Sequence, residues 1–327
     1  SELTIPALIP EDGFHYTSEL YTPFQSVGAR GVKNLASKLL LLLLPPNSPF
    51  LRLSVSGQAK EDLEERRELA SEVEKSLQRI EKNVQNKIEE LALRTSAFEA
   101  IKHLIVGGNV LTYLPNDGHM KVFPLSQYVV TRDSEGELLE IVIKESITPL
   151  SLDVDVRAQV ISDPDYKEDE ECELYTHIYK LDNEKYYICQ EVHGIKIPGS
   201  IGTFAKDKMP YMCLRMVRVD GEDYGRGYVE EFLGDLKSLE GLSQSLVESA
   251  AASSKVVFMI RPNSVTKKRD LALTRNGDII TGSRDDVSVL QTEKQYDLRV
   301  VQESIRQLEE RMSFAFLLHT AIQRDAE

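Results

Sequence analysis

The chain has 327 residues and carries 53 Asp and Glu against 39 Lys and Arg, a formal net charge of −14 at pH 7. This acidity excludes a protein that wraps nucleic acid without sequence preference, because such a protein needs a basic surface to displace the counterions of the phosphates. With 41% hydrophobic and 28% charged residues, the composition is that of a folded soluble protein, and the length allows about two domains or one large one.

The first hundred residues predict helices. Leu35 to Leu44 is the most apolar stretch, which predicts a core helix that ends at Pro45-Pro46 and is too short to span a membrane. From Gln58 to Arg94 apolar residues recur three and four apart among charged ones, the pattern of a long amphipathic helix. A further helix is predicted from Ser96 to Val106, and Gly107-Gly108 ends it.

The middle third is rich in β-forming residues. Two pairs of such runs flank short polar turns and predict two hairpins: Gln127–Thr131 with Leu138–Lys144, and Glu173–Lys180 with Lys185–Val192. An acidic cluster lies between the hairpins: Asp163, Asp165, Glu168, Asp169, Glu170 and Glu171. We interpret it as a solvated loop, and a cation site is the alternative, although an Asp-x-Asp-x-Asp-Gly loop is missing.

The last third predicts two helices around a short β region. The glycine-rich loop Gly221–Gly227 leads into a predicted helix over Tyr228–Ser254. Its apolar face is marked by Phe232, Leu233, Leu236, Leu239, Leu242 and Leu246. The second helix steps by three and four through Leu298, Val301, Ile305, Leu308, Met312, Ala315 and His319. Two such stripes separated by a short β-rich segment predict an antiparallel helix pair with that segment at its tip.

Cysteine and histidine spacing does not support a metal site. Cys172, His177, Cys189 and His193 resemble a two-Cys, two-His zinc set, but Cys172 and His177 are five apart on a predicted strand and therefore point to opposite faces. The three cysteines, with Cys213 as the third, form no Cys-x-x-Cys pair, which favours buried thiols in a reducing compartment.

Motifs for catalysis are also weak. Gly28–Lys33 has the glycines of a phosphate-binding loop without its spacing, and neither a Gly-x-Ser-x-Gly elbow nor a His-Glu-x-x-His pair is present. His103 lies beside apolar residues on a predicted helix, and we interpret it as a core histidine whose polar atoms are hydrogen-bonded, with a catalytic base as the alternative. We predict a non-enzymatic protein without catalytic residues, metal or cofactor.

Positive charge gathers between the two predicted C-terminal helices. The cluster consists of Lys255, Arg261, Lys267, Lys268, Arg269 and Arg275. In an acidic chain this clustering indicates a docking surface for an acidic partner or for phosphate, and an ordinary solvated tip is the alternative. Phe258 is the only aromatic ring nearby, so readout of DNA bases by stacking is not predicted.

Several segments resemble one protein family. Met209–Arg218, Gly221–Gly227 and Glu230–Glu240 resemble the portal (head-to-tail connector) proteins of short-tailed double-stranded DNA bacteriophages. Further segments resemble the same family in the same order: Tyr21–Gly31, Asn34–Leu39, Gly108–Leu111, Tyr113–Pro115, Tyr175–Tyr179 and Arg311–Phe316. The resemblance covers essentially the whole chain.

The resemblance implies an α+β protein with the phage portal fold, in which a mixed α/β wing carries long stem helices and a small α/β clip. It implies a ring, normally of twelve subunits, around a DNA channel at one capsid vertex. The implied parts are a wing over 1–227, stem helices over 228–254 and 296–319, a clip over 255–295 and the start of a channel loop over 320–327. Since the chain begins without Met, has no signal peptide and stops before the family's crown, we expect it to be part of a longer protein.

The resemblance also implies roles for particular residues. Gln323 and Arg324 match a position where the family presents a valve to the channel, and the basic cluster would be the docking surface of the clip. Stem residues facing the lumen would be Glu303, Arg306, Gln307 and Glu310. If twelve copies at −14 each line a channel, the ring carries roughly −168 formal charges, which would repel the phosphates and let DNA slide.

The implied partners are other copies of the chain, the major capsid and scaffolding proteins, the terminase large subunit, a tail adaptor and double-stranded DNA without sequence specificity. No membrane is implied; the protein would assemble in the host cytoplasm, nucleate the capsid and serve DNA packaging and ejection in the virion. Two alternatives stay open. One is another ring component of the phage neck, such as a tail adaptor. The other is a nuclease with Asp163, Asp165 and Glu168 as its metal site.

Overall fold

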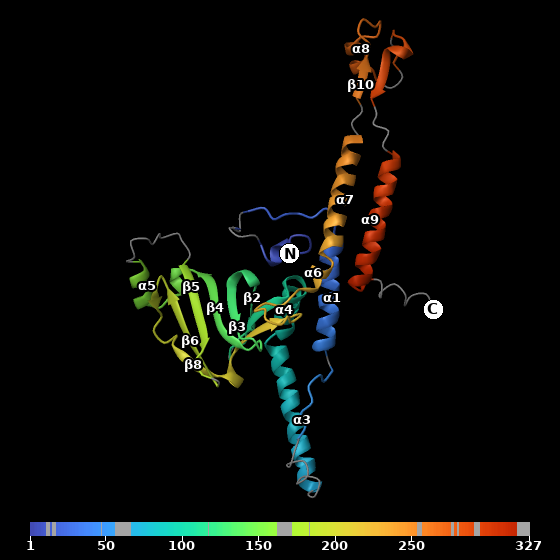
Figure 1. The fold of residues 1–327 in the computed structure, drawn as a ribbon. Coiled ribbons are helices and arrows are strands. Elements are labelled where there is room, and N and C mark those ends of the chain that lie inside the picture. The colour runs from blue at the N-terminus through green and yellow to red at the C-terminus, as the bar shows by residue number, and fades with distance from the viewer. Residues whose placement is uncertain are drawn as a thin grey trace.

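The computed structural model describes residues 1–10, 14, 18–46, 48–55, 67–116, 118–161, 172–182, 184–253, 257–275, 278–279, 281–290 and 295–318. The fold is α+β, as predicted. Figure 1 shows a body of sheets and helices, two long helices that rise from it side by side, and a small unit at their far end. One further helix projects from the body in the opposite direction.

In the described part of the chain before the first strand, the α-helices are α1 (Val27–Leu43), α3 (Arg67–Glu90) and α4 (Leu93–Gly107). The predicted amphipathic helix and the predicted helix after it are confirmed where the structure describes them, with a boundary at Ala92, whose left-handed φ of 49° separates α3 from α4. Gly108 adopts a φ of 72° and its N–H donates to Leu104 O, so the predicted glycine stop of α4 is confirmed. Within the described residues no helix has the length and apolar character needed to cross a bilayer.

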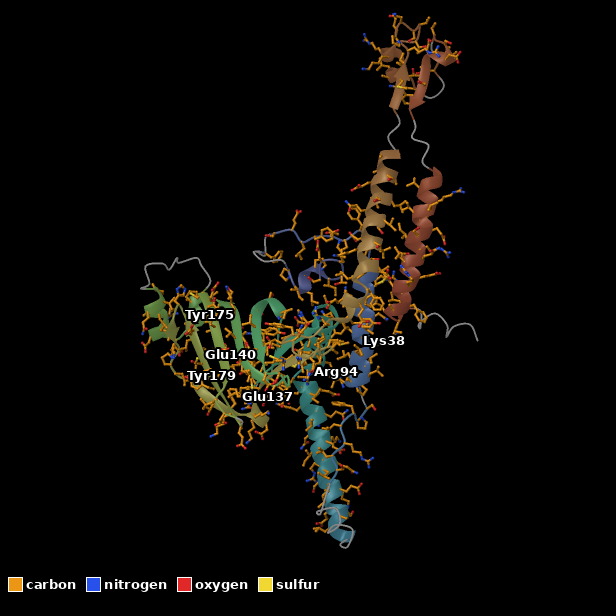
Figure 2. All side chains as sticks on the ribbon, in the orientation of Figure 1. Lys38, Arg94, Glu137, Glu140, Tyr175 and Tyr179 are labelled. Atoms are coloured by element: carbon orange, nitrogen blue, oxygen red, sulfur yellow. The ribbon has the colours of Figure 1, made fainter. Side chains whose placement is uncertain are left out.

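The apolar run Leu35–Leu44 is core only in its first part, so the predicted core helix is confirmed there and wrong for the last turn of α1. Leu35 and Ala36 are buried, but Leu41, Leu42 and Leu43 are 55%, 78% and 60% exposed. The reason is that α1 continues beyond the helices that pack on its first half. The helix does end before Pro45, and Arg94 (Figure 2) donates hydrogen bonds to the terminal carbonyls of Leu44 and Pro45 at 3.2 and 3.1 Å.

The two predicted hairpins are confirmed and belong to one antiparallel sheet. Its order is β3-β4-β5-β6-β7, and β8 also pairs with β6. The strands are β3 (Tyr128–Arg132), β4 (Leu138–Ile147), β5 (Cys172–Lys180), β6 (Lys185–Val192), β7 (Ile195–Lys196) and β8 (Gly202–Ala205). Helix α5 (Val154–Ile161) packs Val156 and Val160 on the inner face of this sheet, against Cys172 and Val192.

A second sheet was not predicted. It has the order β2-β1-β9, with β1 (Asn109–Tyr113), β2 (Lys121–Phe123) and β9 (Tyr211–Arg215). Leu111 and Phe123 of this sheet share one apolar core with Ile141 and Ile178 of the larger sheet. The two sheets therefore form a single packed body.

The C-terminal part contains α6 (Tyr228–Glu231), α7 (Leu233–Ser253), β10 (Val257–Ile260), α8 (Lys268–Leu273), β11 (Val287–Leu290) and α9 (Gln295–Ala315). The antiparallel helix pair with the intervening segment at its tip is confirmed (Figure 1). The first predicted helix is interrupted at Phe232, and α9 ends at Ala315. Short 3-10 turns complete the fold: η1 (Pro6–Leu8), η2 (Leu125–Gln127), η3 (Pro149–Ser151), η4 (Lys206–Lys208) and η5 (Arg284–Asp286).

Glycines join the body to the helix pair. The Asn109 side chain donates to Gly225 O at 2.8 Å and accepts from Gly225 N at 2.7 Å, like a strand partner. A Cβ added at Gly108 would lie 2.5 Å from Gly227 N, and one added at Gly227 would lie 2.5 Å from Val106 O. Because only glycine leaves room for this approach, the loop before α6 is held on the end of α4.

Candidate functional site

The candidate site is the helix pair, α7 with α9, and the unit at its tip. The lower half of the pair is packed, since Leu236, Leu239, Met312 and Phe316 have no exposed surface and contact α1 and α4 in one core. Exposure rises toward the tip, where Val247 is 53% and Val300 68% exposed. The pair is thus anchored at one end and open to solvent along the rest.

The apolar faces largely agree with the predicted stripes. Among the described residues of the second stripe, Leu308 and Met312 are buried and Ile305 is half-buried. In the first stripe Leu233 is 38% exposed, and it directly follows the break at Phe232 between α6 and α7. The predicted second stripe does not include Phe316, which follows the last turn of α9 and is fully buried.

Phe316 fastens the foot of α9. Its ring lies on α1 at Gly31, and it meets the rings of Tyr228 and Phe232 at centroid distances of 6.0 and 6.1 Å. Tyr228 also donates a hydrogen bond to Ala315 O at 2.9 Å. A fully buried aromatic side chain contributes about 1.5–3 kcal/mol through its apolar area, so this contact is a main anchor of the pair.

The carbonyls at the end of α9 are satisfied by α1. Asn34 Nδ2 donates to Phe316 O at 2.9 Å and to Leu317 O at 3.1 Å, and Lys38 Nζ donates to Leu317 O at 2.6 Å. Figure 2 shows Lys38 on α1 beside the foot of α9. A cation at the negative end of the helix dipole is favourable, so α1 fixes where α9 ends.

A buried carboxylate ties the N-terminal segment to α7. Glu240 is 6% exposed and accepts hydrogen bonds from Tyr21 OH at 2.6 Å, from Phe24 N at 2.8 Å and from Gln25 N at 3.4 Å. The hydrogen bond to this carboxylate is the main cause that raises the pKa of Tyr21 to about 12. The sequence pattern does not single out Glu240, because its position on α7 looks like that of any surface glutamate.

The polar face of α9 is a network within one helix. Arg306 donates to Glu303 at 2.9 and 3.2 Å, Gln307 donates to Glu303 at 3.3 Å, and Glu310 lies 4.0 Å from Arg306. The hydrogen bond from Arg306, followed by that from Gln307, lowers the pKa of Glu303. All four side chains are exposed, so the face offers alternating charges to whatever lies beside it. An ion pair joins the two helices, from Arg311 to Asp235 at 3.0 Å.

The tip unit, defined as the described residues from 257 to 290, is a two-stranded ribbon with a short helix. β10 and β11 pair antiparallel from Val257 opposite Leu290 to Ile260 opposite Val287. Thr266 is 3% exposed and donates to Asp286 Oδ2 at 3.0 Å, while a Cβ added at Gly282 would lie 2.2 Å from Thr266 Oγ1. This buried hydrogen bond and the close approach hold the loops of the tip unit together.

The comparisons with known proteins identify the family. A family model described as "Bacteriophage head to tail connecting protein" matches residues 13–327. The chain belongs to this family. It is 43% identical over 335 aligned residues to the portal protein of Escherichia phage T7 and 41% identical over 334 to that of Enterobacteria phage T3. The portal protein of Pseudomonas phage phiKMV is 27% identical over 332 residues.

The alignments cover the whole chain but 62% of the T7 and T3 portal proteins and 65% of the phiKMV protein. The chain therefore spans less than two thirds of the length of these relatives. The predicted resemblance to phage portal proteins is confirmed, and the family places the chain at a head-to-tail connection.

In this family member the described part of the basic cluster lies on the tip unit. Arg261, Lys267, Lys268, Arg269 and Arg275 are all exposed, and Lys255 lies outside the described residues. Apolar side chains are exposed on the same unit: Phe258, Met259, Val265, Leu273 and Ile279. A small unit with both kinds of exposed side chain has the composition of a contact surface.

Other predicted site residues lie outside the part of the chain that the structure describes. Gln323 and Arg324 lie outside the described residues, as does the acidic cluster with Asp163, Asp165 and Glu168. Among the described residues no three His, Cys, Asp or Glu side chains are arranged to hold a metal ion.

The superficial zinc set is split by the sheet. Cys172 packs in the core under α5, whereas His177 lies on the opposite face, with its Nε2 2.6 Å from Glu140 Oε1. Figure 2 shows Glu140 on this face of the sheet. The alternation of side chains along β5 is therefore as predicted. His103 is buried on α4, as predicted, but its Nδ1 has no hydrogen-bond partner among the described residues, so the prediction that its polar atoms are satisfied was wrong.

Proposed function

We propose that this chain is one subunit of a ring, normally of twelve copies, that surrounds a DNA channel at the capsid vertex where a phage head joins its tail. The observation that carries the proposal is the helix pair of a head-to-tail connecting protein, which is anchored at its foot and uncovered above it. Helices in water depend on packing for most of their stability. Neighbouring copies on both sides would supply that packing and stabilise the fold by association.

The proposed parts follow the order of the fold. The body and α3 form the wing over 1–227, α7 and α9 the stem over 228–254 and 296–319, and the tip unit the clip over 255–295. Residues 320–327 begin the channel loop. In support, the body packs as one unit, the two stem helices share its core only at their foot, and the clip stands at the far end of the stem (Figure 1).

The polar face of α9 is proposed to line the channel. Glu303, Arg306, Gln307 and Glu310 are exposed, and the single guanidinium of Arg306 is shared by the carboxylates of Glu303 and Glu310, so the face offers no continuous positive track to phosphates. With roughly −168 formal charges for twelve copies at −14 each, the ring repels DNA overall. DNA would therefore slide through without sequence-specific binding, as packaging and ejection require. The ring performs no bond chemistry in this proposal.

The clip is proposed to dock the terminase large subunit during packaging and the tail adaptor afterwards, while the wing contacts capsid and scaffolding proteins and nucleates the shell. Its exposed cations, including Lys267, Lys268 and Arg269, would meet acidic surfaces of these partners. Reversal of these three charges to Glu should weaken adaptor binding at least about tenfold, mainly by lowering its rate of association, measured by surface plasmon resonance on assembled protein. Unchanged adaptor binding would remove the docking assignment.

Gln323 and Arg324 are proposed as the channel valve, with one arginine per subunit gripping the DNA backbone. Arg324→Ala should leave assembly intact and reduce the fraction of phage heads that retain packaged DNA, measured by nuclease protection. Normal retention would contradict the valve assignment.

Native mass spectrometry of the full chain tests the ring itself. A single closed species at twelve times the subunit mass supports the proposal. A stable monomer at micromolar concentration contradicts it.

A further inference from the structure

Exposed apolar side chains follow one side of α9. Val300 is 68% exposed and Phe314 is 77% exposed. They are fourteen residues apart with Gln307 midway, so the three lie along one side of the helix, and Gln307 borders the proposed channel face. Between the two apolar side chains the surface has a hollow of about 520 Å³, lined by Ser304, Gln307, Leu308, Glu310 and Arg311.

One side of α7 is open where side chains would be expected. Gly234 lies in the first turn of α7, and Gly241 lies seven residues later on the same side of the helix. Both glycines are exposed, and a Cβ added at either position would have no atom within 4 Å. A bulky group from outside this copy could therefore come close to the backbone of α7 at both positions.

The described part of one copy does not explain these glycines. Neither has a positive φ, so the backbone at both positions would accept any residue other than proline. In the middle of a helix, glycine is the least favourable residue after proline. Because no neighbouring atom approaches Gly241, this cost is not offset by packing within the copy. We infer that the reason for Gly241 lies in a contact with another molecule.

The open side of α7 and the apolar side of α9 match in height. The two helices are antiparallel, and the ion pair between Asp235 and Arg311 at 3.0 Å sets Gly234 within one turn of the level of Phe314. Since both helices rise by the same amount per residue, Gly241 then lies at the level of the hollow and Glu248 at that of Val300. Subunits of a ring are related by rotation, so for helices that run along the ring axis the same levels hold between neighbouring copies.

We propose that the apolar side of α9 in one copy packs on the open side of α7 in the next copy, with Phe314 at Gly234 and the hollow at Gly241. The proposal rests on the proposed ring and names a contact that closes it. A second copy is the favoured occupant because each copy carries both surfaces at matching levels. The contact is heterologous, so it repeats around the ring. Missing side chains on α7 shorten the distance between the two helix axes.

Cysteine pairs across the contact test it by oxidative cross-linking of the assembled full chain. Gly234→Cys combined with Phe314→Cys should give covalent dimers and larger species on a non-reducing gel, and so should Glu248→Cys combined with Val300→Cys. The matched control combines Glu248→Cys with Phe314→Cys. It uses the same two surfaces, but its cysteines are about 21 Å apart along the helices, too far for a disulfide. It should give no more cross-linked product than the wild type.

Gly241→Leu tests the open side of α7 without cysteines. In dilute, unassembled protein this variant should melt at a higher temperature than the wild type, because leucine favours a helix more than glycine does. Its assembly should need at least about tenfold more protein, because the added side chain holds the two helices apart. A glycine needed only within one copy would instead give a lower melting temperature, which would overturn the proposal.

Native mass spectrometry of the same proteins separates this contact from the ring itself. A wild-type chain that stays monomeric removes the ring and the contact together. Rings that give no cross-links at the matched pairs, or equal cross-links in the mismatched control, overturn the contact and leave the ring. Unchanged assembly of Gly241→Leu does the same, and it would assign the open side of α7 to a different protein.

Discussion

Gly31→Ala tests how closely α9 must approach α1. The Cβ of an alanine at this position would lie 2.4 Å from Cγ, 2.6 Å from Cδ2 and 2.9 Å from Cβ of Phe316. All three distances are shorter than any normal contact, so either the helix or the ring must move. Phe316 has no exposed surface and is enclosed by Leu236, Leu239 and Met312 in the same core, which leaves the ring no free space.

The expected loss of stability is the balance between a gain in helix propensity and a cost of overpacking the core. Alanine gains about 1 kcal/mol over glycine in a helix interior. Overpacking a core costs about 1–3 kcal/mol, and removal of a buried phenylalanine from its site costs about 3–5 kcal/mol. We therefore expect Gly31→Ala to lower the free energy of unfolding by about 2 kcal/mol. Because α9 is attached here, its amides should also exchange hydrogen faster.

The matched control is Gly241→Ala on α7, where nothing lies within 4 Å of the added Cβ. This variant should gain about 0.5–1 kcal/mol from helix propensity alone. Both variants are compared by urea denaturation and by hydrogen–deuterium exchange of peptides from α9. If Gly31→Ala is as stable as Gly241→Ala, the reasoning is refuted. In a double-mutant cycle, Phe316→Leu should lower the cost of Gly31→Ala, since the two changes act on one contact.

Two further predictions concern buried polar groups. Burial, and secondarily Lys102, lowers the pKa of His103 to about 4, so the unfolded chain takes up this proton first as the pH falls from about 6.5. The free energy of unfolding should therefore decrease by about 3 kcal/mol between pH 6.5 and 4 through this group. In urea titrations at pH 7 and 4.5, His103→Leu should show a correspondingly smaller decrease than the wild type. Equal decreases in the two proteins would contradict the assignment. Glu240→Gln should return the pKa of Tyr21 from about 12 toward its ordinary value, measured by NMR of labelled tyrosine. It should also increase the rate of amide hydrogen exchange in residues 18–26. An unchanged Tyr21 pKa would show that the hydrogen bond is not its cause.

The elements that the sequence predicts are those whose signals are local. The β3–β4 hairpin follows from β-branched runs around a polar turn, and the end of α4 follows from a glycine that adopts a positive φ. The apolar stripes of α7 and α9 predict their pairing because helix faces repeat every three to four residues. Phe316 falls just past that repeat, and its role depends on a glycine in α1 that no periodicity connects with it.

Long-range contacts explain what the sequence could not predict. Strand β1 pairs with β9, about a hundred residues later, and the sequence of neither strand indicates its pairing partner. The end of α1 is as apolar as a core helix, yet Leu42 is 78% exposed because no described element reaches it. For the candidate site, residue types indicate a basic tip, whereas the role of Glu240 depends on hydrogen bonds from Tyr21 and Phe24, which lie more than 200 residues earlier.

Electron cryomicroscopy of the assembled full chain tests the central claim most directly. The account predicts a closed ring of twelve copies in which α9 presents Glu303, Arg306, Gln307 and Glu310 to a central channel and the tip units form one rim. A monomer, or a ring in which this face of α9 is turned away from the channel, would contradict it.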